Sequence, residues 1–490
     1  MTLPFSMRIS RRELLYRGAL AAGSTVLLPL RLRAQAVGPI MVTLSDYMAA
    51  ARDRALPPDV VEKAKHHILD TFAAMVSGSE LPPGRVALAL AQAQAGAARA
   101  VATVVGSNIV AGATDAALVN GVLAHSDETD DSHGASQSHP GASIVPAAFA
   151  LGEQLGITGQ HFLRAVTLGY DVGPRVTIAL GGSVFREESR RSTHAFAGTF
   201  GASTSAGCVA ALTAPQMRWL LDYASQQASG YAVWGRDTDH IEKGFVFGGM
   251  PARNGVTAAL LVRAGWNGVD DVFSGADNFF QVNAPKADPK LLVEQLGERY
   301  EVTRTDIKKW TVGTPIQAPL DAIENLRRQR PFEADDVKSV IVRLAPSVGF
   351  VVDNRDIPDI CLQHMVAVML IDKTASFHAA HDKPRMQDAA VLRQRRKVTY
   401  VPDEGLVKFL PARVARVEVT LNDGTQLSDQ VEAVRGTVRN PMTRDEVVDK
   451  ARDLVGPVLG PATAQKLIEA MLALETMKDV RTLRPLLQKA

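Results

Sequence analysis

Residues 56–78, LPPDVVEKAKHHILDTFAAMVSG, predict a long helix and set the fold class of the chain. Two prolines stand at the start of this stretch and a glycine at its end, which favours helix initiation and termination there. Apolar side chains recur at helical spacing at Val60, Ala64, Ile68 and Phe72. Similar helical periodicity continues to about residue 272 and returns near the C-terminus.

A stretch of different character interrupts the helical pattern. VKSVIVRLAP (337–346) alternates like a strand, and RVARVEVTLNDGTQLS (413–428) predicts two strands around an Asn-Asp-Gly turn. We therefore expect a mainly α fold, in which a large all-α domain carries an inserted, smaller α+β lid domain. The expected ranges are 37–280 for the all-α domain, 281–436 for the lid, and 437–490 for C-terminal helices that return to the all-α domain.

The first 36 residues are typical of a twin-arginine signal peptide. Arg11 and Arg12 precede an apolar run of about 13 residues, shorter than the about 20 that a membrane-spanning helix needs. Small residues at Ala34 and Ala36 then offer a cleavage site. We expect export in folded form to a periplasmic compartment, with no membrane segment left after cleavage. The alternative is a cytoplasmic amphipathic tail with a chance arginine pair.

Composition narrows the classes of partner. The 490 residues include 54 basic and 52 acidic side chains, so the net charge of +2 gives no reason to expect nucleic acid or a membrane surface. The two cysteines, Cys208 and Cys361, stand in apolar stretches and are expected to be buried thiols, although the sequence does not exclude a disulfide. No phosphate loop, G-x-S-x-G elbow or H-E-x-x-H motif occurs.

Residues 125–141, HSDETDDSHGASQSHPG, hold the densest group of reactive side chains. Three interpretations fit: a divalent metal site built from His125, Asp130, His133 and His139; an imidazole base oriented by carboxylates; or a solvated acidic turn. The apolar sequence on both sides favours a loop between buried helices, and so a cavity wall. His139 also precedes a predicted helix start, where free backbone N–H groups favour a substrate carboxylate.

Two further segments carry cations in apolar surroundings. RRSTH (190–194) offers Arg191 for a carboxylate and His194 for proton transfer, or else is a capped helix start with surface arginines. IEKGFVFGGMPARNG (241–255) offers Lys243 and Arg253 as anion-binding groups, or else is a close-packed structural bend.

Taken together, these segments resemble the MmgE/PrpD family. The resemblance is carried by VEKAKHHILDTFAAMVSG, NGVLAHSDETDDSHGASQSHPGASIVPAA, THAFAGTFGAS, GGMPARNGVTAALL, QHMVAVMLID and DGTQLSDQVEAVRGTVRNPMTRDEV, in the family's order. It implies an all-α domain with an α+β lid, a homodimer, and no bound cofactor or metal. It also implies a lyase that abstracts a proton next to a carboxylate of a small polycarboxylic acid. An isomerase or epimerase, and a non-catalytic periplasmic carboxylate-binding protein, are the alternatives.

The resemblance also assigns expected roles. His139 would be the general base or acid, with His194 or His364 as its partner. The residues that match the family's acidic run, or lie near its other site positions, would orient imidazoles or bind substrate; they are Glu128, Asp130, Asp131, Ser132, Lys243, Arg191, Arg253 and Gln317. Three positions depart from the family pattern: Gln317 and Phe247 stand where histidines are common, and His364 where a tyrosine is common. These departures indicate a distinct subfamily.

Overall fold

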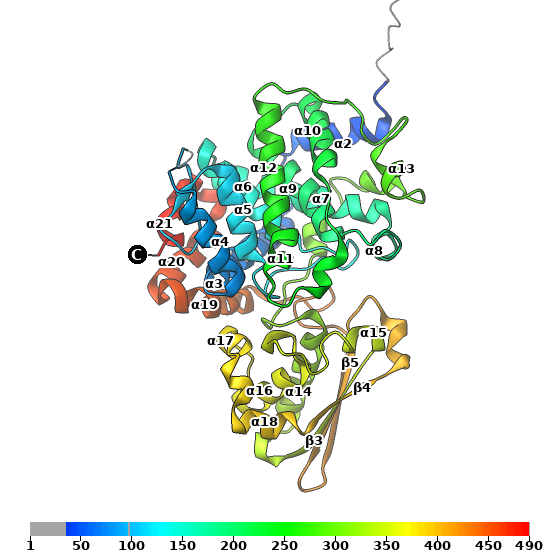
Figure 1. Ribbon diagram of the computed structural model, residues 1–490, viewed down its shortest axis with the longest axis vertical. Coiled ribbons are helices and arrows are strands. Elements are labelled where there is room, and N and C mark those ends of the chain that lie inside the picture. The colour runs from blue at the N-terminus through cyan, green and yellow to red at the C-terminus, as the bar shows by residue number, and fades with distance from the viewer. Residues whose placement is uncertain (1–35, 97–98, 490) are drawn as a thin grey trace, which may run out of the picture. The chain divides into compact units, whose positions relative to one another are not determined.

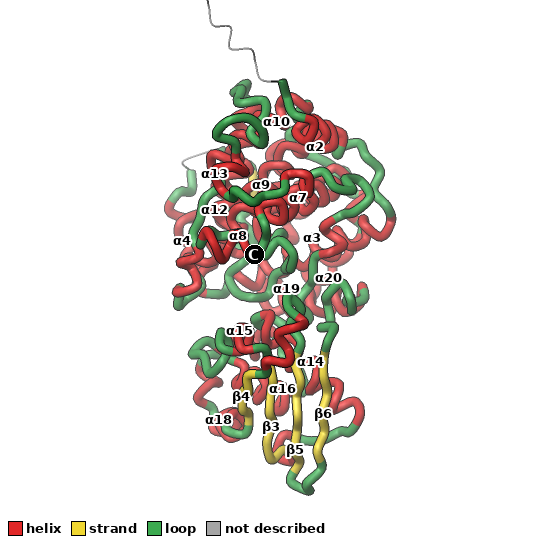
Figure 2. Tube along the Cα trace, turned by 90° about the vertical axis from the view of Figure 1, so that its right-hand side faces the viewer, coloured by secondary structure: helices red, strands yellow, loops and turns green. Residues whose placement is uncertain are grey.

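The structure, a computed structural model, describes residues 36–96 and 99–489 (Figure 1). The described chain is mainly helical, which confirms the predicted fold class. The predicted signal peptide lies, up to residue 35, outside the described residues. Figure 2 shows that the longer strands gather in one part of the molecule, next to a few helices, while the rest is helical.

The helical part consists of helices from both ends of the chain and one short hairpin. Its helices are α2 (Pro39–Ala50), α3 (Pro58–Gly78), α4 (Pro82–Ala93), α5 (Ala113–Ala124), α6 (Gly141–Leu155), α7 (Gly159–Leu180), α8 (Ser183–Ser189), α9 (Thr193–Val209), α10 (Ala214–Gln227), α11 (Ile241–Gly244), α12 (Met250–Arg263), α13 (Phe279–Asn283), α19 (Arg444–Leu459), α20 (Pro461–Leu472) and α21 (Arg484–Leu487). The hairpin pairs β1 (Ala102–Thr103) with β2 (Val110–Ala111).

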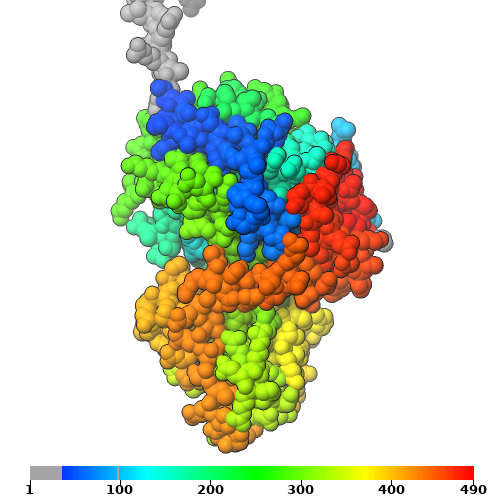
Figure 3. Space-filling model, turned by 180° about the vertical axis from the view of Figure 1, so that it is seen from behind, coloured from blue at the N-terminus to red at the C-terminus, as the bar shows by residue number. Residues whose placement is uncertain are grey.

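Helix α3 lies inside the helical part. Pro58 occupies its first turn, and from Ala64 to Gly78 every residue is buried, so all faces of the helix contact protein. The C-terminal helices α19 and α20 pack against it, which brings the two ends of the described chain together. Figure 3 shows the red C-terminal segment beside the blue N-terminal helices. The last helices therefore pack with the helical part.

Small residues allow the helices next to the site to touch along their backbones. Every residue of α9 is buried, and a side chain at Gly173 of α7 would meet the Ala197 carbonyl oxygen at 2.5 Å. A second close approach joins α5 to a π-helical turn at Phe245–Gly249, where a side chain at Gly248 would collide with the Gly121 carbonyl oxygen. This contact holds the π turn against the end of α5, where the acidic loop begins.

The α+β part contains a four-stranded sheet of order β4-β3-β5-β6. Its elements are α14 (Thr314–Gln329), β3 (Val337–Leu344), α15 (Pro346–Gly349), α16 (Leu362–Asp372), α17 (Phe377–His381), α18 (Ala389–Arg395), β4 (Val398–Pro402), β5 (Ala415–Leu421) and β6 (Gln426–Val431). β3 pairs with β4 in parallel and with β5 antiparallel, and the predicted hairpin joins β5 to β6. Alternating burial along β3 and β5 leaves one sheet face for packing.

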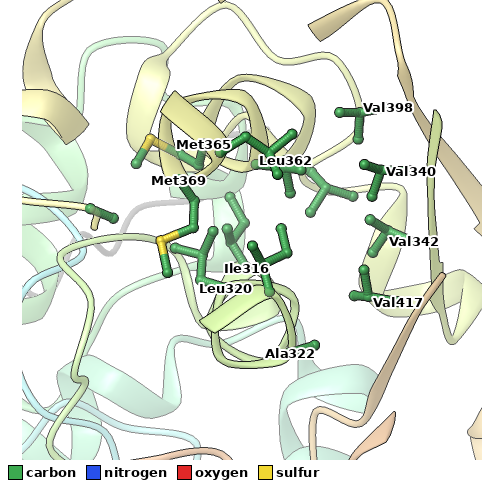
Figure 4. Packing of buried hydrophobic residues seen from close by; sticks show 14 of the residues in the cluster. Ile316, Leu320, Ala322, Val340, Val342, Leu362, Met365, Met369, Val398 and Val417 are labelled. Carbon is green, nitrogen blue, oxygen red and sulfur yellow. The ribbon is translucent and has the colours of Figure 1, made fainter. Parts of the chain in front are cut away.

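Helices α14 and α16 cover that face. Figure 4 shows Ile316 and Leu320 of α14 and Leu362 of α16 pointing toward Val342 and Val417 of the sheet. This hydrophobic cluster begins at Trp310 and ends at Val434. It gives the α+β part a core of its own, separate from the helical part.

Residues 281–309, which the sequence analysis assigns to the lid, contact the helical part. The guanidinium of Arg175 in α7 donates to the carbonyl oxygens of Glu294 at 2.6 Å and Arg299 at 2.8 Å. Arg175 is fully buried, so these bonds fix the segment firmly against α7.

The two cysteines and most of one long apolar stretch are buried in the protein. Cys208 and Cys361 are buried free thiols, as predicted. Within the described residues, the stretch Ile241–Arg263 is long and apolar enough to cross a membrane by length and composition, and 72% of its apolar window is buried inside the protein.

Candidate active site

The acidic loop connects α5 to α6 and is almost wholly buried. His125 ends α5, and Gly141 begins α6. Asp130 and Asp131 are 0% exposed, and Glu128 is 8% exposed. A buried run of carboxylates requires compensating partners. The solvated acidic turn that the sequence left open is therefore not what the loop forms.

Asp130 joins two imidazoles. Its Oδ2 lies 2.9 Å from Nδ1 of His125, and its Oδ1 lies 3.1 Å from Nδ1 of His139. Burial alone would raise the pKa of Asp130, but the two imidazoles hold this pKa well below its usual value. Asp130 is therefore a carboxylate that only accepts hydrogen bonds, so the Nδ1 atom of each imidazole donates to it and the Nε2 atoms are not used on Asp130.

Two lysines neutralise the remaining acidic charge of the loop. The Lys243 ammonium pairs with Oε1 of Glu128, and Nζ of Lys308 lies 3.6 Å from Oε2 of Glu128 and 3.7 Å from Oδ1 of Asp130. Burial raises the pKa of Glu128, yet Lys243, Lys308 and then His240 hold it well below the usual value. The structure thus brings together four predicted residues, Glu128, Asp130, His139 and Lys243.

Asp131 has a different environment. Its Oδ2 accepts from His67 Nδ1 at 2.8 Å and from the Tyr170 hydroxyl at 2.5 Å, and its Oδ1 accepts from the Gly141 backbone N–H at 3.0 Å. These bonds join α3, α7 and the start of α6. Both carboxylate oxygens are therefore used to fix the loop against the helices.

Phe247 of the π turn lies at the centre of a group of aromatic rings. His194 stacks on it with ring centroids 3.7 Å apart, and His125 stacks on it at 4.6 Å. The His139 ring centroid lies 5.2 Å from that of His194, and Trp234 contacts His194 edge-on at 5.5 Å. Phe247, where the family often has a histidine, thus makes an apolar wall between imidazoles.

Burial changes the protonation of His194. It lowers the pKa of this imidazole well below its usual value, and the neighbouring His139 and Arg186 lower it further. His194 is therefore neutral near pH 7. Its Nδ1 is buried without a hydrogen-bond partner among the described residues.

A cavity of about 580 Å³ opens beside His139 and His194. Its wall comes from both the helical part and the α+β part. Apart from histidines, the charged side chains that line it are six cations and two anions: Arg186, Arg304, Lys308, Arg413, Arg435, Arg439, Asp306 and Glu432. Such a size suits a small molecule, and the excess of cations favours an anionic one.

The α+β part also contacts the acidic loop directly. Nε2 of His381, in α17, lies 2.9 Å from Oδ2 of Asp127. Burial lowers the pKa of His381, but the Asp127 carboxylate outweighs this and raises it to about 9. Burial raises the pKa of the nearby Asp359 to about 7, partly opposed by His381.

Other predicted site residues lie apart from the imidazole cluster or have their polar atoms committed. Arg191 donates to the Asn283 side chain, and Arg253 donates to its neighbour Asn254 at 3.4 Å. His364 is fully buried in α16, where burial, with Arg395 and Arg385, lowers its pKa to about 4. The charges that act on His364 therefore belong to the α+β part and not to the acidic loop.

Ser132 and Gln317 do line the cavity. The Gln317 amide nitrogen donates to the carbonyl oxygens of Trp310 at 2.7 Å and Val312 at 2.9 Å, and its oxygen accepts from the Trp310 N–H at 3.1 Å. This side chain therefore fixes the turn before α14. The backbone of Ser132 exchanges hydrogen bonds with that of Asp306, which ties the acidic loop to the segment before Lys308.

The four residues considered for a metal site do not converge as a set. Ligand atoms of His125, Asp130 and His139 lie within 4.8 Å of one another, as do those of His125, Glu128 and His240. His133, in contrast, uses Nδ1 on Ser136 at 2.8 Å and Nε2 on Glu301 at 3.2 Å. The ammonium groups beside Glu128 and Asp130 already supply positive charge where a cation would bind.

Several residues of the site were not predicted from the sequence. One of them, His240, precedes the predicted site residue Lys243 by three positions, so a search for histidines near that lysine finds it. No local pattern marks the others, which come from distant segments; they are Lys308, Asp359, His381, Arg186 and Arg413.

Comparison with known proteins identifies relatives along most of the chain. Residues 42–292 match the MmgE/PrpD N-terminal domain, and residues 310–476 match the MmgE/PrpD C-terminal domain. Cis-aconitate decarboxylase of Aspergillus terreus is 27% identical over 468 residues, covering 88% of this chain and 92% of the relative. The human cis-aconitate decarboxylase is 26% identical over 462 residues, covering 88% and 90%. The 2-methylcitrate dehydratase-like protein oryR of Aspergillus oryzae is 26% identical over 172 residues, covering 32% and 34%.

Proposed function

Since the chain belongs to the MmgE/PrpD family and is a lyase of that type, we propose that it transfers a proton at a carbon next to a carboxylate of a small polycarboxylic acid. The observation that carries this proposal is the pairing of Asp130 with His139 at the wall of a cation-rich cavity. An imidazole held by a carboxylate at one nitrogen offers the other nitrogen for proton transfer.

His139 is the proton-transfer group of this proposal. Its Nδ1–H points to Asp130, so its Nε2 is the nitrogen that exchanges a proton with substrate. The carboxylate fixes the ring and stabilises the imidazolium that forms when His139 holds the proton. His194, neutral and close to His139, is the second imidazole that faces the substrate.

Lys308 stabilises the negative charge of the intermediate that has no proton at the reacting carbon. The intermediate is an enolate, whose charge lies mainly on the oxygens of the neighbouring carboxylate. Lys308 is 4% exposed and lines the cavity. Burial lowers the pKa of its ammonium, but Glu128 and Asp130 outweigh this and raise it, so the cation persists near pH 7. A fixed cation in a poorly hydrated site acts strongly on such charge.

The bond broken in the reaction is, in our proposal, carbon–carbon. The relatives that align over most of this chain are cis-aconitate decarboxylases, whereas the dehydratase-like relative aligns over 32% of it. In a decarboxylation the bond to the departing carboxylate breaks and carbon dioxide leaves. Its electron pair passes through the neighbouring double bond onto the remaining carboxylate. Protonated His139 then donates its proton to carbon.

The test compares two substrates in deuterium oxide. The full chain is incubated with cis-aconitate and, separately, with 2-methylcitrate, while released carbon dioxide is measured and products are followed by NMR. We expect carbon dioxide and one deuterium on the product from cis-aconitate. Loss of water from 2-methylcitrate without carbon dioxide from cis-aconitate would overturn the decarboxylase assignment. Deuterium exchange without net product would point to an isomerase, and binding without exchange to a carboxylate-binding protein.

We also propose that the protein acts as a homodimer after export. The arginine pair and apolar run of the first 36 residues support export, and family membership supports a dimer. Cell fractionation of the Arg11→Lys, Arg12→Lys variant tests the first point, because the twin-arginine route requires both guanidiniums. Light scattering of the purified protein tests the second.

A further inference from the structure

Two arginines line the cavity and have no acidic partner among the described residues. Arg186 lies in α8 of the helical part, and Arg413 lies just before β5 of the α+β part. Both are half-buried. Burial lowers the pKa of each guanidinium, and the charge of Arg186 lowers the pKa of Arg413 further. The two guanidiniums thus line one cavity, and the charge of each disfavours the other.

Three other cations of the cavity are already paired. Nη1 of Arg304 lies 3.2 Å from Oε2 of Glu301, and Arg435 pairs with Glu446 at 2.5 Å. Lys308 contacts the acidic loop. Among the described lining residues, the hydrogen bonds and ion pairs of the structure include none to the guanidinium of Arg186 or Arg413, although both are partly withdrawn from water. Two like charges held together at such a site favour an anion between them.

Arg186 is also tied to the imidazole cluster. Its guanidinium carbon lies 5.2 Å from the centroid of the Trp234 ring, and that ring contacts His194 edge-on. One aromatic ring thus separates Arg186 from His194. An anion bound by Arg186 and Arg413 would therefore lie near the imidazole cluster. The atoms that contact the arginines would not be the ones that contact His139.

We propose that Arg186 and Arg413 together bind one carboxylate of the substrate, remote from the carbon at which the proton moves. This inference rests on the proposed function, and it names the group that selects polycarboxylates over simpler acids. A carboxylate accepts from two guanidiniums at once. Because the two arginines come from different parts of the chain, the bound carboxylate also joins the α+β part to the helical part.

The test measures binding of tricarballylate, an unreactive tricarboxylate, by calorimetry. Arg186→Gln and Arg413→Gln are each expected to weaken binding by about tenfold to a hundredfold, the effect of losing a charged hydrogen bond. Because both arginines bind the same carboxylate, their effects should not be independent. The fold loss of affinity in the double variant should be smaller than the product of the fold losses in the two single variants. Arg186→Lys and Arg413→Lys keep the charge but lose the forked guanidinium. Their affinities should lie between that of the wild type and those of the glutamine variants.

Arg439→Gln is the matched control. This arginine lines the same cavity but is exposed, and its removal should change the affinity less than threefold. Thermal unfolding checks that the variants fold, and we expect no loss, since each substitution removes a repulsive charge. Wild-type affinity in Arg186→Gln and Arg413→Gln, with decarboxylation intact, would overturn the arginine site and leave the proposed function standing. A wild-type protein that neither binds tricarballylate nor acts on a polycarboxylate would overturn both.

Discussion

Oδ1 of Asp130 lies 3.1 Å from Nδ1 of His139, and the same carboxylate holds His125 through its other oxygen. The two oxygens thus fix two imidazole rings whose centroids are 4.8 Å apart. Only His139 of this pair lines the cavity; His125 is fully buried. The geometry therefore separates a ring that meets substrate from a ring that supports the carboxylate.

His139→Asn should remove turnover while leaving substrate binding in place. Loss of a proton-transfer group costs about 10²–10⁴-fold in rate. We expect a fall in kcat of that size, with the affinity for tricarballylate unchanged within a few-fold. Steady-state kinetics and calorimetry on the same preparation measure the two quantities.

The control for this variant is His378→Gln, because His378 is an exposed histidine on α17. It should keep wild-type kcat. Turnover that survives in His139→Asn, at a level close to that of the control, would show that another group moves the proton.

Asp130→Asn should lower kcat more than it changes KM. Asp130 contacts the imidazole and not the cavity, so it acts by positioning His139. An amide preserves the shape of the carboxylate but removes the charge that stabilises the imidazolium, and a loss of about tenfold to a hundredfold in kcat follows. Asp130→Glu, which restores the charge, should recover part of the rate. A change confined to KM would contradict the positioning role.

Lys308→Met should destabilise the protein strongly. Lys308 and its partners Glu128 and Asp130 are buried, so removing the ammonium leaves carboxylates without compensation. Breaking such a buried pair costs about 3–5 kcal/mol. Lys286→Met is the control, because Lys286 pairs with Glu188 at 3.5 Å on the surface and should cost less than about 0.5 kcal/mol. Denaturant unfolding measures both, and equal losses would contradict the prediction.

The sequence predicts the elements of the fold better than their boundaries. The apolar period in α3 and the alternation in β3 are local signals, and both elements appear where they are predicted. Residues 281–309 carry no such period, and their attachment to the helical part depends on single contacts such as those of Arg175. An attachment of this kind leaves no pattern in the sequence.

The residues of the site also differ in how well the sequence predicts them. Asp130 and His139 come from one short loop, so their proximity can be predicted. Lys308 and His381 reach that loop from distant segments, and neither stands in a recognisable motif. His364 lies in the stretch of α16 that is buried from Leu362 to Leu370, so the α+β part encloses it. A histidine in such a helix has no sequence signal that separates burial from function.

Removal of divalent metal should leave activity unchanged. His125, Asp130 and His139 could hold an ion, but Lys308 lies 3.7 Å from Asp130 and Lys243 pairs with the adjacent Glu128, so both ammonium groups would repel it. We expect full activity after dialysis against EDTA and less than stoichiometric metal by elemental analysis. Activity lost on chelation and restored by zinc would contradict this.

The His381–Asp127 contact should make stability fall as the pH rises above neutrality. The pKa of His381 is raised to about 9 by Asp127, against burial. A group with a raised folded pKa stabilises fully below its unfolded pKa, near 6.5, and this contribution is lost as the pH rises through about 9. The pKa of the neighbouring Asp359 is raised by burial to about 7. Its contribution to stability is therefore already lost once the pH has risen above about 7, before His381 loses its proton.

Unfolding free energies measured between pH 7.5 and 10 therefore report the contribution of His381 separately from that of Asp359. The wild-type protein should lose on the order of 2–3 kcal/mol over this range, beyond any loss in His381→Gln. His378→Gln, which alters an exposed histidine on the same helix, should follow the wild type. If the His381→Gln curve parallels the wild-type curve, the ion pair between α17 and the acidic loop contributes nothing to stability.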